Sequence, residues 1–147
     1  LEPYAARFED RPKNLFAYLA VKHLGYWAET FICHGAPAHL RAACHASLEA
    51  LMAGLRPGAT LSSLALAAQA KLGGRDLHPV LTGRFGRRIG LSLDEGASIR
   101  IDATGVVEEN VVYALHVGAM EGDAAYVASA LVVLRHGQCD ILDRSGS

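Results

Sequence analysis

The spacing of hydrophobic residues differs along the chain: the middle has a helical spacing, whereas both ends have short apolar runs. Over residues 38–55 the apolar side chains recur at spacings of four, four, three and four residues, which predicts an amphipathic helix. A Pro-Gly turn follows, and residues 61–72 predict a second helix that Thr60 can cap and that Gly73 and Gly74 can end. The stripe of the first helix consists of Leu40, Cys44, Leu48, Leu51 and Leu55.

Short apolar runs before and after the helices predict β-strands. Residues 26–33 are rich in aromatic and β-branched side chains and indicate a strand, whereas residues 15–21 fit either a buried strand or a short helix. Runs bounded by turn residues predict three more strands at 111–117, 126–134 and 139–142. The order of strands, two helices and further strands predicts an α+β fold with the helices on one face of a largely antiparallel sheet.

The composition fits one globular domain. The chain has 147 residues, of which 51% are hydrophobic and 20% are charged, and this is enough apolar chain for one buried core. Its polar start, which contains Pro3 and Pro12, predicts a lead-in segment at residues 1–14. A single domain is expected to occupy residues 15–147.

Charge, hydropathy and cysteine count each exclude a class of protein. The formal net charge of -1 leaves no basic surplus for binding phosphates, so we expect no nucleic acid partner. The longest strongly apolar runs are about ten residues, too short to cross a bilayer, so we expect no membrane partner. Cys33, Cys44 and Cys139 form an odd set without paired spacing, which favours reduced thiols and a cytoplasmic location.

Four segments carry patterns that occur together, and in this order, in one known family. They are GYWAETF at residues 25–31, LRPGAT at 55–60, GRRIGLSLDE at 86–95 and NVVYALHVG at 110–118. The first segment is typical of a strand and contains an acidic residue, Glu29, directly before Thr-Phe. The second is typical of a turn between two adjacent helices.

These segments resemble the pita-bread metallopeptidases, which include methionine aminopeptidase, Xaa-Pro aminopeptidase, prolidase and creatinase. In that family the first, third and fourth segments read Gly-Tyr-x-x-Asp/Glu, GHGIGLxxHE and GMVFTIEPG. The resemblance covers roughly residues 15–142 and implies a partial pita-bread fold, with an antiparallel sheet and two adjacent helices on one face. The first helices of the family and one strand would precede Leu1, so the N-terminal portion of the domain is expected to be missing.

The resemblance also implies where a metal centre would lie. Active members hold two divalent metals on two Asp, one His and two Glu side chains, and the metals activate a bridging water. These ligands fall on Tyr18, Glu29, Arg87, His116 and Ala128. Tyrosine is a poor ligand at neutral pH, alanine carries no donor, and arginine brings a permanent positive charge. We therefore expect no metal and no other cofactor.

Arg87 suggests a replacement for the metal charge. A carboxylate buried on a strand is costly unless it is paired, and a bidentate arginine is a suitable partner, so we expect Arg87 to pair with Glu29. The alternative is that Arg87 and Arg88 point into solvent from a loop. His116 lies inside an apolar run and is either a hydrogen-bonded structural residue or, beside Glu29, an acid or base.

These observations leave the enzymatic status open and predict, first, a metal-free homologue of the Xaa-Pro aminopeptidases and prolidases. It would be non-catalytic and would bind a small molecule or peptide through Arg87, Tyr18 and Asp94, the last at the position of a substrate-contacting histidine in the family. The second hypothesis is a metal-independent, creatinase-like C–N hydrolase with His116 as acid or base and Glu29 or Glu95 as its partner. A metallopeptidase is the third, and it requires a different alignment. Members of the family are often dimers, so a homodimer is an expectation that rests on the resemblance alone.

Overall fold

The computed structural model describes residues 15–96 and 98–145, so the expected lead-in segment lies outside the described residues. Two helices, eight strands and one short 3-10 helix are formed within the described ranges. In chain order they are β1 (Leu15–His23), β2 (Tyr26–His34), α1 (Ala38–Gly54), α2 (Leu61–Lys71), β3 (Asp76–Leu77), η1 (Pro79–Leu81), β4 (Gly86–Ile89), β5 (Ser98–Ile99), β6 (Val111–Glu121), β7 (Ala124–Arg135) and β8 (Gln138–Arg144).

The first two strands form an antiparallel hairpin, which resolves the choice between strand and helix at its start. β1 and β2 pair along their full length, from Leu15 opposite His34 to His23 opposite Tyr26. Leu24 and Gly25 turn the chain, and both adopt positive φ angles, of 49° and 90°. Glycine adopts this backbone conformation without strain, so Gly25 suits the hairpin turn.

The two helices form where the apolar periodicity predicts them. All five residues of the α1 stripe are buried, as are Leu61, Leu64, Ala68 and Leu72 on α2. The hydroxyl of Thr60 accepts a hydrogen bond from the Ser63 amide and so caps α2. The sequence pattern and the local capping therefore agree with the tertiary packing of this part of the chain.

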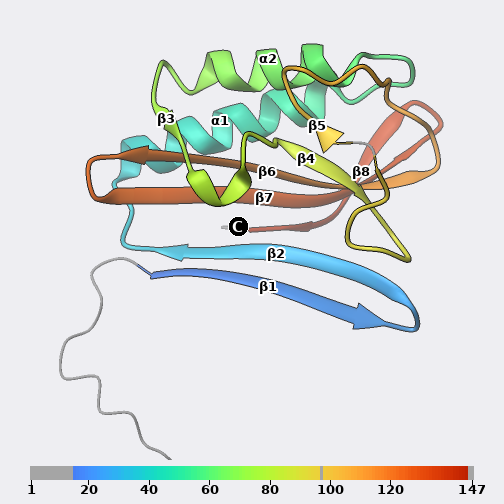
Figure 1. The fold of residues 1–147 in the computed structure, drawn as a ribbon, viewed down its shortest axis with the longest axis horizontal. Coiled ribbons are helices and arrows are strands. Elements are labelled where there is room, and N and C mark those ends of the chain that lie inside the picture. The colour runs from blue at the N-terminus through green and yellow to red at the C-terminus, as the bar shows by residue number, and fades with distance from the viewer. Residues whose placement is uncertain (1–14, 97, 146–147) are drawn as a thin grey trace, which may run out of the picture.

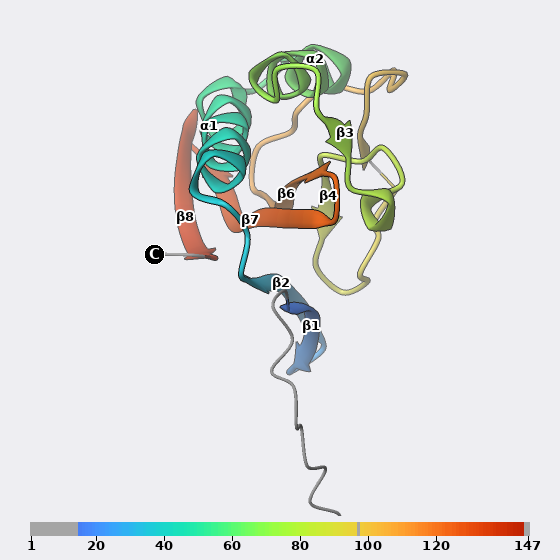
Figure 2. The same ribbon diagram turned by 90° about the vertical axis from the view of Figure 1, so that its left-hand side faces the viewer.

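The remaining strands form one antiparallel sheet with the order β5-β4-β6-β7-β8, and β3 pairs with β6 off this path. Figures 1 and 2 show α1 and α2 above this sheet and the β1–β2 hairpin below it. α1 packs on β6 and β7, whereas β2 contacts β7 from the opposite side. The predicted α+β arrangement is confirmed, with the addition that the hairpin forms a sheet of its own.

β6 and β7 are buried on both faces because they lie between the helices and the hairpin. Successive side chains of a strand point to opposite faces, so one set faces the helices and the other faces the hairpin. Leu115 and Val117 belong to the main core with the helices, while His116 stands opposite Ser129 on the hairpin side. Of the buried residues that are grouped as polar or charged among those described, Glu29, His116 and Ser129 lie in the layer between the hairpin and the sheet, whereas Ser47 lies on α1.

The outer side of the hairpin is apolar and exposed. The large hydrophobic side chains of the hairpin that are exposed are Leu15, Phe16, Tyr18, Leu19, Val21, Leu24, Tyr26 and Ile32. Two of them, Phe16 and Tyr18, nevertheless contact the inner layer, through Phe31 and Glu29. Glu29 and Phe31 of β2, in contrast, are buried against the sheet. None of the described helices is long and apolar enough to span a membrane.

Candidate functional site

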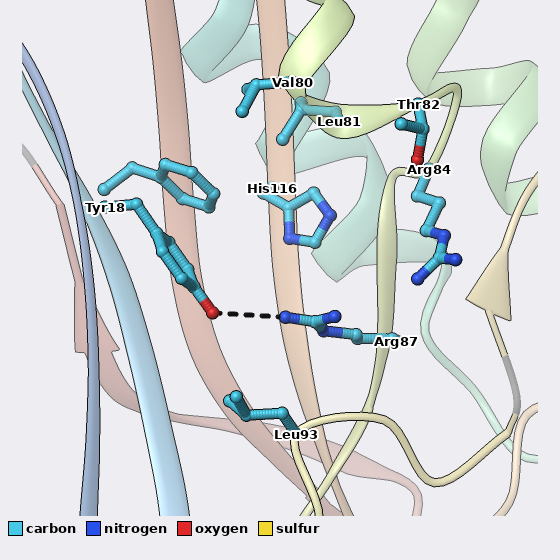
Figure 3. Close-up of a pocket in the computed structure, with 9 residues that line it drawn as sticks. Tyr18, Val80, Leu81, Thr82, Arg84, Arg87, Leu93 and His116 are labelled. Atoms are coloured by element: carbon cyan, nitrogen blue, oxygen red, sulfur yellow. Dashed lines mark hydrogen bonds between the residues drawn. The ribbon is translucent and has the colours of Figure 1, made fainter.

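Four of the five positions assigned to metal ligands come together between the hairpin and the sheet. Tyr18 comes from β1, Glu29 from β2, Arg87 from β4 and His116 from β6, and their side chains form one cluster. Figure 3 shows Tyr18 and Arg87 pointing toward one another across the pocket, with the His116 ring beside them. The structure thus assembles positions that are up to 98 residues apart in the chain.

Glu29 is the centre of this cluster, and both of its oxygens are bound. Arg87 donates from Nε to Oε1 at 3.2 Å and from Nη2 to Oε2, while the Tyr18 hydroxyl donates to Oε2 at 2.6 Å. The Glu29 side chain is 2% exposed and the Arg87 side chain 18%. The predicted ion pair is therefore present, and it is bidentate and almost fully removed from solvent. Burial tends to lower the pKa of Arg87, but the hydrogen bond and charge of Glu29 outweigh it, and the net direction is upward.

Tyr18 acts as a neutral donor in this network. Burial, followed by the hydrogen bond and the charge of Glu29, raises the pKa of Tyr18 to about 12. Its hydroxyl also accepts a hydrogen bond of 3.3 Å from Nη2 of Arg87. The phenol therefore remains protonated at neutral pH and supplies a third hydrogen bond to Glu29 in addition to the two from arginine.

His116 lies beside the ion pair without a close polar contact to it. Its Nδ1 is 4.0 Å from Oε1 of Glu29, and its ring packs edge-on against Phe31 with 5.8 Å between the centroids. Burial lowers the pKa of His116 to about 4; Glu29 acts in the opposite direction, and the charges of Arg87 and Arg84 lower it further. The imidazole is consequently neutral at physiological pH.

The fifth assigned position is wrong by one residue. Ala128 is opposite Val117 in the strand pairing and belongs to the core beneath the helices, so its side chain points away from the cluster. Ser129, one residue on, is opposite His116, and its Oγ accepts a hydrogen bond of 3.1 Å from the Phe31 amide. A shift of one residue in a strand moves a side chain to the other face of the sheet. Ser129 ties β2 to β7 at this site.

The two acidic residues of the loop after β4 have separate positions. Asp94 accepts a hydrogen bond of 3.1 Å from Nη1 of Arg84, a residue that lines the pocket. Glu95 instead uses Oε1 to accept the backbone amides of Leu91 at 2.8 Å and Ser92 at 3.4 Å. Its carboxylate holds the loop in shape, so the suggested pairing of Glu95 with His116 is not supported by the geometry.

A pocket of about 360 Å³ opens beside the cluster, within the range of small-molecule sites. The residues that line it are Tyr18, Phe31, Val80, Leu81, Thr82, Arg84, Arg87, Leu93 and His116. Gly118 on β6 allows η1 to close one side, because a Cβ there would lie 2.8 Å from the His78 Cβ and 2.9 Å from Leu81 Cδ1. Phe31 and Arg84 were not assigned to this pocket from the sequence, although Phe31 ends the first family-like segment.

The side chains present do not fit a dinuclear metal centre. Two hard cations need several anionic oxygen ligands at short range. Within residues 15–96 and 98–145, no three His, Cys, Asp or Glu side chains are grouped so that they could hold a metal ion. The one carboxylate of the cluster already accepts hydrogen bonds on both oxygens, and a guanidinium group lies against it.

The chain belongs to metallopeptidase family M24, whose family model matches residues 20–136. This confirms the family resemblance drawn from the four segments. No protein with a curated description matches the chain.

Several solved structures share the fold at low sequence identity. X-Pro aminopeptidase from Thermotoga maritima MSB8 superimposes with a TM-score of 0.77 at 20% identity, over 90% of this chain and 40% of that one. Prolidase from Pyrococcus furiosus gives a TM-score of 0.78 at 15% identity, over 91% and 42%. The N-terminal domain of the FACT complex subunit SPT16 from chickpea, Cicer arietinum, gives 0.75 at 17% identity, over 91% and 36%. This chain therefore spans about two-fifths of the length of such proteins, and the likeness establishes a partial pita-bread fold.

Proposed function

We propose that the protein is a metal-free homologue of the Xaa-Pro aminopeptidases and prolidases, and that its pocket binds a small molecule or peptide without hydrolysing it. The observation that carries this proposal is the ion pair between Arg87 and Glu29. It lies where the family resemblance places two of the metal ligands.

The arginine opposes a metal in two ways. Its charge is permanent, so it repels a divalent cation at every pH at which the protein is folded. It also occupies both oxygens of Glu29, the one carboxylate in the cluster, so a metal could bind there only after a buried ion pair had been broken. Breaking such a pair costs several kcal/mol, roughly 3–5 kcal/mol in measured cases.

The fold by itself is compatible with a binding role. Folds of this kind support many functions, and activity depends on the site that a particular chain carries. Among the similar structures, the chickpea protein is named as a subunit of a complex, whereas the Thermotoga and Pyrococcus proteins are named as peptidases. The altered site supports a binding role for this chain.

A metal-independent, creatinase-like C–N hydrolase is the second candidate, and the position of His116 favours it. The imidazole lines the pocket and lies 4.0 Å from Glu29. A neutral imidazole with a pKa near 4 accepts a proton from substrate only weakly, because a base works best with a pKa near the working pH. Hydrolysis of creatine or of small amides that is lost in His116→Gln would establish this candidate in place of the first.

Metal content is the direct test of the proposed function. We expect protein purified without chelator to contain no stoichiometric metal by elemental analysis, and its melting temperature to stay constant when manganese, cobalt or zinc is added. A metal that binds only the folded state at a hundred times its Kd would stabilise it by about 2.7 kcal/mol, so the melts would detect such a site. Stoichiometric metal that raises the melting temperature would overturn the proposal, and peptidase assays on Xaa-Pro substrates would follow.

A matched variant controls for metal held elsewhere on the surface. His39 and Glu121 form an exposed pair, 2.9 Å apart, that could take up zinc or cobalt weakly. If His39→Ala abolishes a metal-dependent shift, the shift comes from this surface pair and leaves the proposal intact. If the shift persists in His39→Ala and disappears in Glu29→Gln, the metal is at the cluster.

A further inference from the structure

The pocket presents the donors of two guanidinium groups, and the acceptors among its lining side chains are uncharged, on Tyr18, Thr82 and His116. Arg87 uses Nε and Nη2 to bind Glu29 and Tyr18, and Nη1 takes no part in these bonds. Arg84 binds Asp94 through Nη1, while its Nε is buried and has no hydrogen-bond partner within the described part of the chain. A guanidinium group carries five N–H donors, so both arginines keep donors beyond the bonds to Glu29, Tyr18 and Asp94.

The negative charge of the cluster is not available to a ligand. Glu29 is 2% exposed, and both its oxygens face Arg87 and Tyr18. The Tyr18 hydroxyl donates a hydrogen bond to Glu29 and is therefore protonated, and a histidine ring carries no negative charge in either of its protonation states. A ligand in the pocket therefore meets two guanidinium groups and no competing anion, except Asp94 at the outer end of Arg84.

The rest of the pocket is apolar. Phe31, Val80, Leu81 and Leu93 form its hydrocarbon walls. Figure 3 shows Arg87 extending toward Tyr18, and Arg84 on the side of the His116 ring away from Tyr18. A ligand that fits these walls has an apolar body, and a polar end that accepts hydrogen bonds matches the two guanidinium groups. An ionised carboxylate is acceptor-only and matches the fork of a guanidinium group.

We propose that this pocket binds the carboxylate of a small apolar molecule, with Arg84 and Arg87 as its donors. The inference rests on the proposed function, because the carboxylate would bind beside Arg87, the arginine at a metal-ligand position of the family. The same chemistry is offered by a small organic acid and by the C-terminus of a peptide, and the test separates these sources.

Calorimetric titration of chelator-treated protein tests the proposal with two matched pairs of probes. The first pair is 3-phenylpropanoate and 3-phenylpropanamide, and the second is N-acetylphenylalanine and its amide. We expect at least one acid to bind about tenfold or more tightly than its own amide, since the charged hydrogen bonds are lost in the amide. Preference for the acid only in the second pair identifies a peptide C-terminus, and preference in the first identifies an organic acid.

Arg84→Gln is the diagnostic variant, because the Arg84 side chain is 34% exposed and its replacement leaves the buried ion pair intact. It should reduce the preference for the acid by about tenfold. Arg100→Gln is the control: Arg100 is a surface arginine paired with Asp102 outside this pocket, and its replacement should leave the preference unchanged. Thermal melts of both variants confirm that they are folded.

Equal binding of acid and amide, no binding of either, or an unchanged preference in Arg84→Gln would each overturn the inference. Repeating the titrations with manganese separates this failure from failure of the proposed function. A preference for the acid that appears only with manganese shows a metal site, and then both claims fall. If the protein binds no metal and does not prefer the acid over its amide, only the carboxylate proposal is overturned and the proposed function stands.

Discussion

Replacing Arg87 with alanine should lower the free energy of unfolding by about 3–5 kcal/mol, the largest single effect expected at this site. The variant removes two hydrogen bonds to Glu29 and, among the described residues, the one positive charge that contacts it. The Glu29 side chain is 2% exposed. A carboxylate left in a buried site must remain charged without a partner or become protonated, and both are costly. Chemical denaturation of Arg87→Ala and of the unaltered protein at pH 7 measures the difference.

Arg88 provides the matched control on the same strand. Its guanidinium group pairs with Glu108, which is 54% exposed, so Arg88→Ala should cost no more than about 1 kcal/mol. Adding Glu29→Gln to Arg87→Ala should restore part of the lost stability, because the buried charge is then removed together with its partner. If Arg87→Ala is no more damaging than Arg88→Ala, the ion pair does not hold the site together.

The helices and the long strands could be predicted because each is encoded by its own local pattern. The stripe from Leu40 to Leu55 needs no distant contact to be recognised, and the same is true of the apolar runs of β6 and β7. β4 was not predicted, since its four residues, GRRI, include two arginines and have no clear alternation. It is a strand because β6 and β5 flank it on either side, and this pairing lies outside its own sequence.

The part of the site that depends on charge complementarity could be predicted from the sequence. The parts that depend on which face of a strand a residue occupies, or on how a loop folds, could not. A carboxylate on a buried strand needs a positively charged partner, as Glu29 does. The family resemblance placed Arg87 at a neighbouring metal-ligand position, so Arg87 was the expected partner. Ala128 and Ser129 differ only in which face of β7 they occupy, and the register with β6 decides that. Glu95 and Arg84 depend on the folded loops around β4, so no local pattern in the sequence could show that one binds its own loop and the other lines the pocket.

His116 should make stability fall as the pH is lowered from about 6.5 to 4. In the unfolded chain a histidine has its ordinary pKa of 6.5, whereas burial lowers the pKa of folded His116 to about 4, and the neighbouring charges of Glu29, Arg87 and Arg84 only adjust it. Above pH 6.5 neither state binds the proton, so this residue contributes no pH dependence. Between these pKa values only the unfolded state is protonated, and stability decreases by on the order of 3 kcal/mol in total.

Denaturation curves at half-unit intervals from pH 7.5 to 4 isolate this contribution when the unaltered protein is compared with His116→Gln, which is similar in size and does not titrate. The variant should show a shallower loss of stability in this window, by up to about 1.4 kcal/mol per pH unit. His34→Gln, a change on the exposed end of β2, controls for the general effect of removing a histidine and should retain the steeper dependence. Identical slopes for His116→Gln and the unaltered protein would mean that folded His116 takes up its proton near pH 6.5, and the imidazole would then be charged beside Glu29 in mildly acidic solution.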